Sequence, residues 1–264
     1  MIRNAEYRWL RPAELRITVE ASKTIDHLME QASRALAGMD YLTCERQCVE
    51  ALGLARAAGD WADYCRILLP LQEARRQRRM IASQGTIRLG TGELSDPPAT
   101  WISHLDAGCI VVTKPHGVDV AGDLSGIARR DHKWIEVLFV DGATTDPVWT
   151  LRSFNGPPAV IKRTAPDRAW VDHWLKPQER LPGGEPSGKG ARRDERNGEI
   201  VAGPSDWFLN AAESLGDAAL EQVTPELLGA DRIAALEQRL LVVADHEIMH
   251  QALWQAARQM CAPS

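Results

Sequence analysis

Two histidines near the C-terminal end of the chain have the spacing of a metal site. His246-Glu247-Ile248-Met249-His250 reads H-E-x-x-H. On a helix this spacing places two imidazoles one turn apart for a zinc ion, with the glutamate as general base. A zinc hydrolase also needs a third protein ligand and a coordination position open to water. A zinc hydrolase is therefore one alternative for this chain.

The residues around the motif favour a structural role instead. After His250 the chain reads QALWQAARQMCAPS, which offers no His, Asp or Glu as a third ligand. Asp245 is a plausible N-cap, and Glu247 in the first turn complements the helix dipole. A stripe at helical spacing predicts a buried face with both histidines on its flank; it consists of Met249, Leu253, Ala256 and Met260. No metal ligand is therefore assigned.

A second group of polar residues follows two predicted strands of the middle segment. Lys114 and His116 come after the strand predicted over 109–113, and Asp141 follows the strand predicted over 134–140. Ligands of α/β sheets bind at the carboxyl ends of strands. Lys114, His116 and Asp141 could thus form the site of a hydrolase or small-ligand-binding enzyme. An ordinary polar crossover loop is the simpler interpretation, so no catalytic residue is assigned.

Two further sequence patterns give little support for a binding site. Gly183–Gly190, GGEPSGKG, has the skeleton of a phosphate-binding loop, but Gly190 stands where Ser or Thr should hold magnesium and no strand precedes it. No cofactor is expected. The run Arg75-Arg76-Gln77-Arg78-Arg79 lacks interleaved aromatic residues, and arginines around a helix are usually solvated or complement its C-terminus. Nucleic-acid binding is not expected.

The segment 1–83 is predicted to be helical. Helices are expected over 24–38 and 41–58, the second capped by Asp40 and ended by Gly59. Asp60 caps a further helix that Pro70 should kink or end, because proline removes a main-chain hydrogen bond. Cys44 and Cys48 lie on the apolar stripe of the helix 41–58 and are expected in the core.

This segment resembles a tetratricopeptide (TPR) unit. The resemblance rests on Asp40-Tyr41-x-x-Cys44, Ala51-Leu52-x-x-Ala55 and Gly59-Asp60-Trp61. In that family small residues mark the contacts between antiparallel helices. Cys44 would take the small-residue position and Ala51 that of the close-contact alanine. The resemblance implies packed helical hairpins and binding of a protein partner.

The remaining segments complete an α+β chain. In 84–175, strands are predicted over 109–113, 134–140, 148–154 and 159–162, with a helix over 118–131, which makes a small α/β domain. The segment 176–203 is rich in glycine, proline and charge and is predicted to be a flexible linker or exposed loop. In 204–264 helices are expected over 205–222, 231–243 and 245–260.

Composition sets the expected compartment and partner. No apolar run approaches the roughly 18 residues needed to cross a bilayer, and the five cysteines lack C-x-x-C spacing, which favours a reducing cytoplasm. From Glu199 onward ten acidic residues stand against three arginines, a net charge of −7, while the whole chain has −5. The acidic end argues against nucleic acid there and suits a basic protein partner. The expected function is that of a non-catalytic cytoplasmic interaction or scaffold protein.

Overall fold

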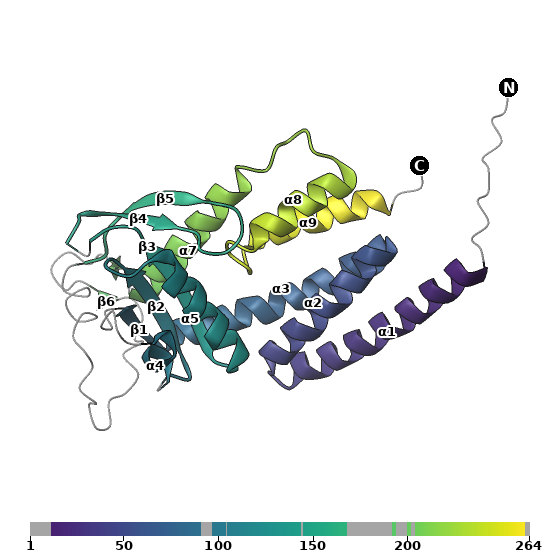
Figure 1. Ribbon diagram of the computed structural model, residues 1–264, viewed down its shortest axis with the longest axis horizontal. Helices are drawn as coiled ribbons and strands as arrows, with labels where there is room; N and C mark the ends of the chain where they lie inside the picture. The colour runs from purple at the N-terminus through teal and green to yellow at the C-terminus, as the bar shows by residue number, and fades with distance from the viewer. Residues whose placement is uncertain are drawn as a thin grey trace. The chain divides into compact units, whose positions relative to one another are not determined.

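The computed structural model describes residues 12–90, 97–103, 105–143, 145–167, 192–193, 200–201 and 204–261. It shows an α+β protein with a helical N-terminal part, a mixed sheet and a helical C-terminal part, as predicted (Figure 1). Two compact units are present, one formed by Met1–Ala74 with Ala257–Ser264 and the other by Arg75–Ala256. No helix in the described ranges is long and apolar enough to span a membrane.

Three helices open the chain: α1 (Pro12–Ala37), α2 (Tyr41–Ala58) and α3 (Trp61–Gln84). The bounds predicted for α2 are confirmed. Asp40 accepts a hydrogen bond from the Thr43 N–H at 3.1 Å, and Gly59 takes the left-handed conformation at φ 68°. α1 and α2 form a packed helical hairpin, and Cys44 and Cys48 are completely buried, as expected.

Pro70 does not end the helix in which it lies. α3 continues past this proline to Gln84. Leu71 and Ala74, which follow it, are 1% and 0% exposed. Burial of apolar side chains on the far side of the proline offsets the missing main-chain hydrogen bond. Of the two outcomes predicted for Pro70, termination is therefore wrong.

A five-stranded sheet forms the centre of the second unit, in the order β1-β2-β3-β4-β5. The strands β1 (Thr86–Gly90), β2 (Ala107–Thr113) and β3 (Trp134–Val140) are parallel, and β4 (Val148–Arg152) and β5 (Val160–Thr164) continue antiparallel. The predicted hairpin of β4 and β5 is confirmed. β1 was not predicted, because Thr86-Ile87-Arg88-Leu89-Gly90 is short and has only two large apolar residues.

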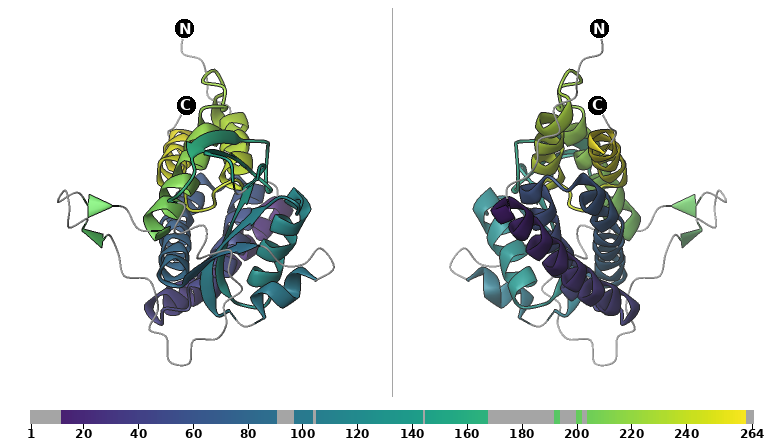
Figure 2. Two further views of the ribbon diagram at one scale, coloured as in Figure 1. Left: turned by 90° about the vertical axis from the view of Figure 1, so that its left-hand side faces the viewer. Right: turned by 90° about the vertical axis from the view of Figure 1, so that its right-hand side faces the viewer.

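Helices lie on both faces of the sheet (Figure 2), and each face has its own hydrophobic core. On one face α4 (Pro98–Ile102) and α5 (Val118–Arg130) cover Ile110, Val137 and Phe139. On the other, α7 (Pro204–Leu220) places Trp207 and Phe208 against Trp149 and Leu151 of β4. Trp149 and Trp207 meet edge to face, with ring centroids 5.4 Å apart.

The C-terminal helices are shorter than predicted. α8 (Gly229–Leu240) ends before Val243, and α9 (Glu247–Met260) begins after Asp245. The residues between them form a tight connection that carries the polar groups described below. The predicted linker 176–203 lies outside the described residues except for Arg192–Arg193 and Ile200–Val201, which pair as the short strands β6 and β7.

Candidate functional site

His246 caps the helix that carries the H-E-x-x-H motif. It directly precedes α9, and its Nδ1 accepts a hydrogen bond from the Met249 N–H at 3.3 Å. This is the contact of an N-cap side chain with the third residue of the helix. The prediction that Asp245 is the N-cap is therefore wrong. The Asp245 carboxylate forms an ion pair with Arg79 instead.

Both histidines are themselves fully buried, whereas the prediction placed them only at the flank of the buried face of the helix. His246 is 0% exposed and His250 1%. Space for the His246 ring exists because position 216 of α7 is glycine. A Cβ added to Gly216 would overlap Cδ2 and Cγ of that ring. The His246 imidazole, in the connection that precedes α9, thus packs directly against the backbone of α7.

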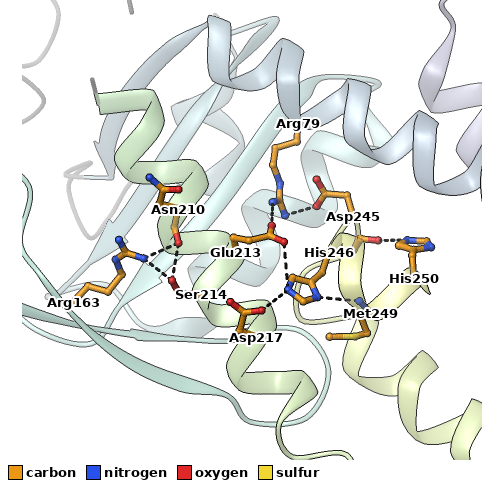
Figure 3. A network of polar contacts seen from close by, with 11 residues as sticks. Arg79, Arg163, Asn210, Glu213, Ser214, Asp217, Asp245, His246, Met249 and His250 are labelled. Atoms are coloured by element: carbon orange, nitrogen blue, oxygen red, sulfur yellow. Dashed lines mark hydrogen bonds and ion pairs between the residues drawn. The ribbon is translucent and has the colours of Figure 1, made fainter. Parts of the chain in front are cut away.

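The hydrogen bonds of these rings fix where their protons lie. Because Nδ1 of His246 accepts a main-chain N–H, its ring proton is on Nε2, which lies 3.1 Å from Oδ1 of Asp217 and 3.4 Å from Oε1 of Glu213. Nε2 of His250 lies 3.0 Å from the carbonyl oxygen of Ala244, which can only accept, so this nitrogen also donates. In Figure 3 the two rings point to different partners.

This arrangement differs from that of a zinc site. A ligand nitrogen must offer its lone pair to the metal, whereas both Nε2 atoms donate protons to oxygen atoms. Glu247, the general base of the zinc alternative, is exposed and accepts a hydrogen bond from Gln251 at 3.1 Å. Across the described ranges no group of three or more His, Cys, Asp or Glu could hold a metal ion.

Arg79 of α3 contacts two carboxylates near His246, one from α7 and one from the connection before α9 (Figure 3). Its guanidinium lies 3.4 Å from Oε2 of Glu213 and forms an ion pair with Asp245. The Arg79 and Asp245 side chains are only 10% and 8% exposed. Burial raises the pKa of Asp245 to about 6, and the positive charge of Arg79 opposes this effect. We call Arg79, Glu213, Asp217, Asp245 and His246 the buried network, because Arg79, Asp245 and His246 are buried; the Glu213 and Asp217 side chains that contact them are 43% and 52% exposed.

A second arginine of the same helix is also buried. Nε of Arg78 lies 2.8 Å from Oε1 of Glu136 in β3, and the Arg78 side chain is 5% exposed. The expectation that the arginine run of α3 is solvated or complements a helix end is wrong for Arg78 and Arg79. Their guanidinium groups instead neutralise carboxylates from β3, α7 and the connection before α9.

The structure brings Lys114 and Asp141 together at the carboxyl ends of β2 and β3. Nζ of Lys114 lies 3.0 Å from Oδ1 of Asp141, and Nε of Arg152 lies 2.7 Å from Oδ2. The hydrogen bond from Lys114 and the charges of Lys114 and Arg152 lower the pKa of Asp141. A carboxylate held ionised between two cations is a weak proton acceptor, so this exposed cluster is poorly suited to general base catalysis.

His116 is placed differently from the other two residues of that predicted group. It is 4% exposed, and its ring lies edge-on against Trp101, with ring centroids 4.6 Å apart. The Lys114 side chain, by contrast, is 62% exposed. The His116 imidazole is buried against Trp101, whereas the Lys114 ammonium group is exposed to solvent. The two side chains therefore do not form one solvent-facing site.

Sequence reasoning did not identify several members of these clusters. Arg79 and Asp217 lie far along the chain from Asp245 and His246, and no local motif connects them. One signal was available on α7, because Glu213 and Asp217 are spaced i, i+4 and two like charges on one helical face call for a cationic or hydrogen-bonding partner. Arg152 could have been found from strand alternation, which places it on the same face as Phe139.

Comparison of the chain with protein-family models, with curated proteins and with solved structures gave no match.

Proposed function

We propose that this protein is a non-catalytic cytoplasmic interaction or scaffold protein whose acidic helical segment, 204–264, binds a basic protein partner. One observation carries the proposal. Glu221, Glu226 and Asp231 are exposed, and no basic side chain of the described residues lies within ion-pair distance of them. We call these three residues the acidic surface.

The two arginines that lie nearest in sequence to the acidic surface, Arg232 and Arg239, do not neutralise it. Arg239 donates to Oε1 of Gln222 at 2.7 Å, and Arg232 donates to the Pro225 carbonyl at 3.5 Å. The negative charges are therefore directed to solvent, while the positive charges hold the connection between α7 and α8. Unpaired surface charge of one sign attracts a partner of the other sign and accelerates their encounter.

The N-terminal helices support the same class of function. The α1–α2 hairpin buries Cys44, Ala51 and Ala55 at the positions that the TPR resemblance implies. Met39 and Leu69 in this part are 70% and 72% exposed. TPR-like helices that leave large apolar side chains exposed would serve as a second surface for partners. The five cysteines are all thiols without disulfides, which supports a reducing compartment.

The enzyme alternatives have less support. His246 and His250 use both Nε2 atoms as donors to protein oxygens, and Asp141 is paired with two cations. Neither arrangement leaves a ready base or a set of metal ligands. The exposed acidic surface is therefore the feature that best supports a function in binding.

The test is affinity capture with charge-neutralised variants of the full chain. Glu221→Gln, Glu226→Gln and Asp231→Asn are combined in one variant. The matched control combines Glu50→Gln, Asp106→Asn and Asp123→Asn, which changes net charge equally at exposed positions elsewhere. We expect the native chain and the control to retain strongly basic proteins that the first variant loses. Equal retention by all three chains would refute the proposal.

A further inference from the structure

One face of the β4–β5 hairpin is not covered by a described helix. The register pairs Arg152 with Val160 and Thr150 with Lys162, so these side chains share a face. Phe139 of β3 opposes Arg152, and this is the face that α5 covers over β2 and β3. α5 does not extend over β4 and β5 on this face, and the side chains of Val148 and Val160 are 50% and 44% exposed.

This uncovered face carries positive charge. Lys114 and Arg152 share the single carboxylate of Asp141, and no acidic side chain of the described residues lies within ion-pair distance of the exposed Lys162. Three cations therefore stand against one anion. We call Lys114, Val148, Arg152, Val160 and Lys162 the basic shelf. It combines exposed β-branched side chains with three cationic side chains, which together with the one carboxylate of Asp141 leave a formal net charge of about +2.

The connection between α7 and α8 has the opposite character. It arches away from the two helices in Figure 1 and bears Glu221 and Glu226, while Asp231 follows in the first turn of α8. Leu228 lies between Glu226 and Asp231 and is 74% exposed. A large apolar side chain flanked by unpaired carboxylates matches the basic shelf, where valines are flanked by cations.

We propose that a second copy of this chain is a partner of the acidic surface, with its basic shelf seated on Glu221, Glu226, Leu228 and Asp231 of the first copy. The inference rests on the proposed function, since it names the basic partner. Carboxylates would face Lys114 and Lys162, and Leu228 would cover Val160. Such a contact joins two different surfaces, so it either closes into a symmetric assembly or continues from copy to copy.

Physical chemistry predicts a weak and salt-sensitive association. Each exposed ion pair contributes little to stability or binding, and such pairs are screened over roughly 8 Å at physiological ionic strength. Self-association should therefore grow with protein concentration and fall when salt is added. Leu228→Ser should weaken it as well, because the leucine supplies the apolar part of the contact.

Sedimentation velocity of the full chain with charge-reversed variants tests the inference. One variant carries Glu221→Lys, Glu226→Lys and Asp231→Lys. The other carries Lys114→Glu and Lys162→Glu, which leaves the Arg152–Asp141 pair in place. Each variant alone should sediment as a monomer where the native chain associates. Mixed together they should associate again, since the reversed acidic surface of one copy now meets the reversed shelf of the other.

Three results would overturn the inference: a native chain that stays monomeric at low salt, variants that associate as the native chain does, or a mixture that stays monomeric. A control with Glu50→Lys, Asp106→Lys and Asp123→Lys should associate like the native chain. Unfolding curves show whether each variant is folded, and Leu228→Ser adds a readout without a change of charge. If the native chain is monomeric while the neutralised acidic surface still loses basic proteins, the proposed function stands and self-association fails.

Discussion

The buried network around His246 and the exposed cluster around Asp141 use similar residue types in opposite surroundings. In the buried network the side chains of Arg79, Asp245 and His246 are at most 10% exposed. In the exposed cluster the side chains of Lys114 and Arg152 are 62% and 48% exposed. Burial of Arg79, Asp245 and His246 distinguishes the first group, whereas its Glu213 and Asp217 side chains are 43% and 52% exposed, like those of the second.

This difference decides what each group can do. Desolvation makes an unpaired charge costly, so each member of the buried network is held by a partner and the network fastens α3, α7 and the start of α9 together. Charges in water can exchange partners at little cost, so the exposed cluster remains able to bind a ligand or another protein. The motif with the stronger catalytic signature is therefore held in hydrogen bonds and ion pairs within the protein, and the weaker pattern faces the solvent.

The largest contrast should come from removing one arginine from each group. Arg79→Ala leaves Asp245 without its cation in a buried site and should lower the free energy of unfolding by about 3–5 kcal/mol. Arg152→Ala removes a partner of the exposed Asp141 and should cost about 1 kcal/mol or less. Urea unfolding of both variants measures the difference. Equal costs would contradict the contrast between the two groups.

The two aspartates should also give pH dependences of opposite sign. Burial raises the pKa of Asp245 from its ordinary value of 3.8 to about 6. Between these values the folded chain holds a proton that the unfolded chain has lost, so the free energy of unfolding falls as pH rises through this window. Asp245→Asn should remove that fall, as followed by unfolding across a pH series.

Asp141 should contribute in the other direction. Lys114 and Arg152 lower its pKa below 3.8, so its stabilisation is present above that pH and is lost as the pH falls further. Asp141→Asn should therefore flatten only the acid end of the pH profile. The same slope for both aspartates would show that one of the two environments is misassigned.

A glycine pair tests the packing of the buried network. Gly216→Ala places a methyl group inside the His246 ring and should cost about 1–3 kcal/mol through overpacking. Gly122→Ala in α5 meets no atom within 4 Å and should stabilise its helix by about 0.5–1 kcal/mol. Thermal unfolding compares the two variants. A tolerated alanine at position 216 would mean that the imidazole does not lie against α7.

The smallest expected effects concern His246 and Glu247, which have different roles at the start of the H-E-x-x-H helix. His246→Ala removes a helix cap and should cost about 0.5–2 kcal/mol. Glu247→Gln removes only a first-turn charge and should cost a few tenths of a kcal/mol. Denaturant midpoints resolve both changes. If Glu247→Gln were instead to abolish a hydrolytic activity of the chain, the structural role of the motif would be wrong.

Local sequence patterns predicted the elements well where one stretch of chain determines the result. Asp40 and Gly59 bound α2 because caps act over three or four residues, and the run Trp134–Val140 became β3 with its predicted bounds. The short strand β1 was missed because its pairing with β2, for example Ile87 with Cys109, depends on a distant partner. Pro70 did not end α3, since burial of the following residues outweighed the local penalty.

The polar sites were predictable only in part. Strand order allowed Lys114 and Asp141 to be placed together, because the ends of neighbouring parallel strands meet. The missing third ligand after His250 favoured a structural role for the helix, and the hydrogen bonds of both histidine rings are compatible with that role. Arg79 is supplied by another helix, and no sequence pattern connects it to Asp245. For Asp217 the i, i+4 spacing with Glu213 indicates that a partner is needed but does not identify His246 as that partner.

The most direct test of the account is the position of the ring protons on His246 and His250. Long-range ¹⁵N–¹H correlation spectra of the full chain near neutral pH distinguish a protonated from an unprotonated imidazole nitrogen. We expect both rings to carry the proton on Nε2, with Nδ1 of His246 accepting the Met249 N–H. Protons on Nδ1 of both rings, with Nε2 shifted by a bound metal, would contradict the structural role and restore the zinc site.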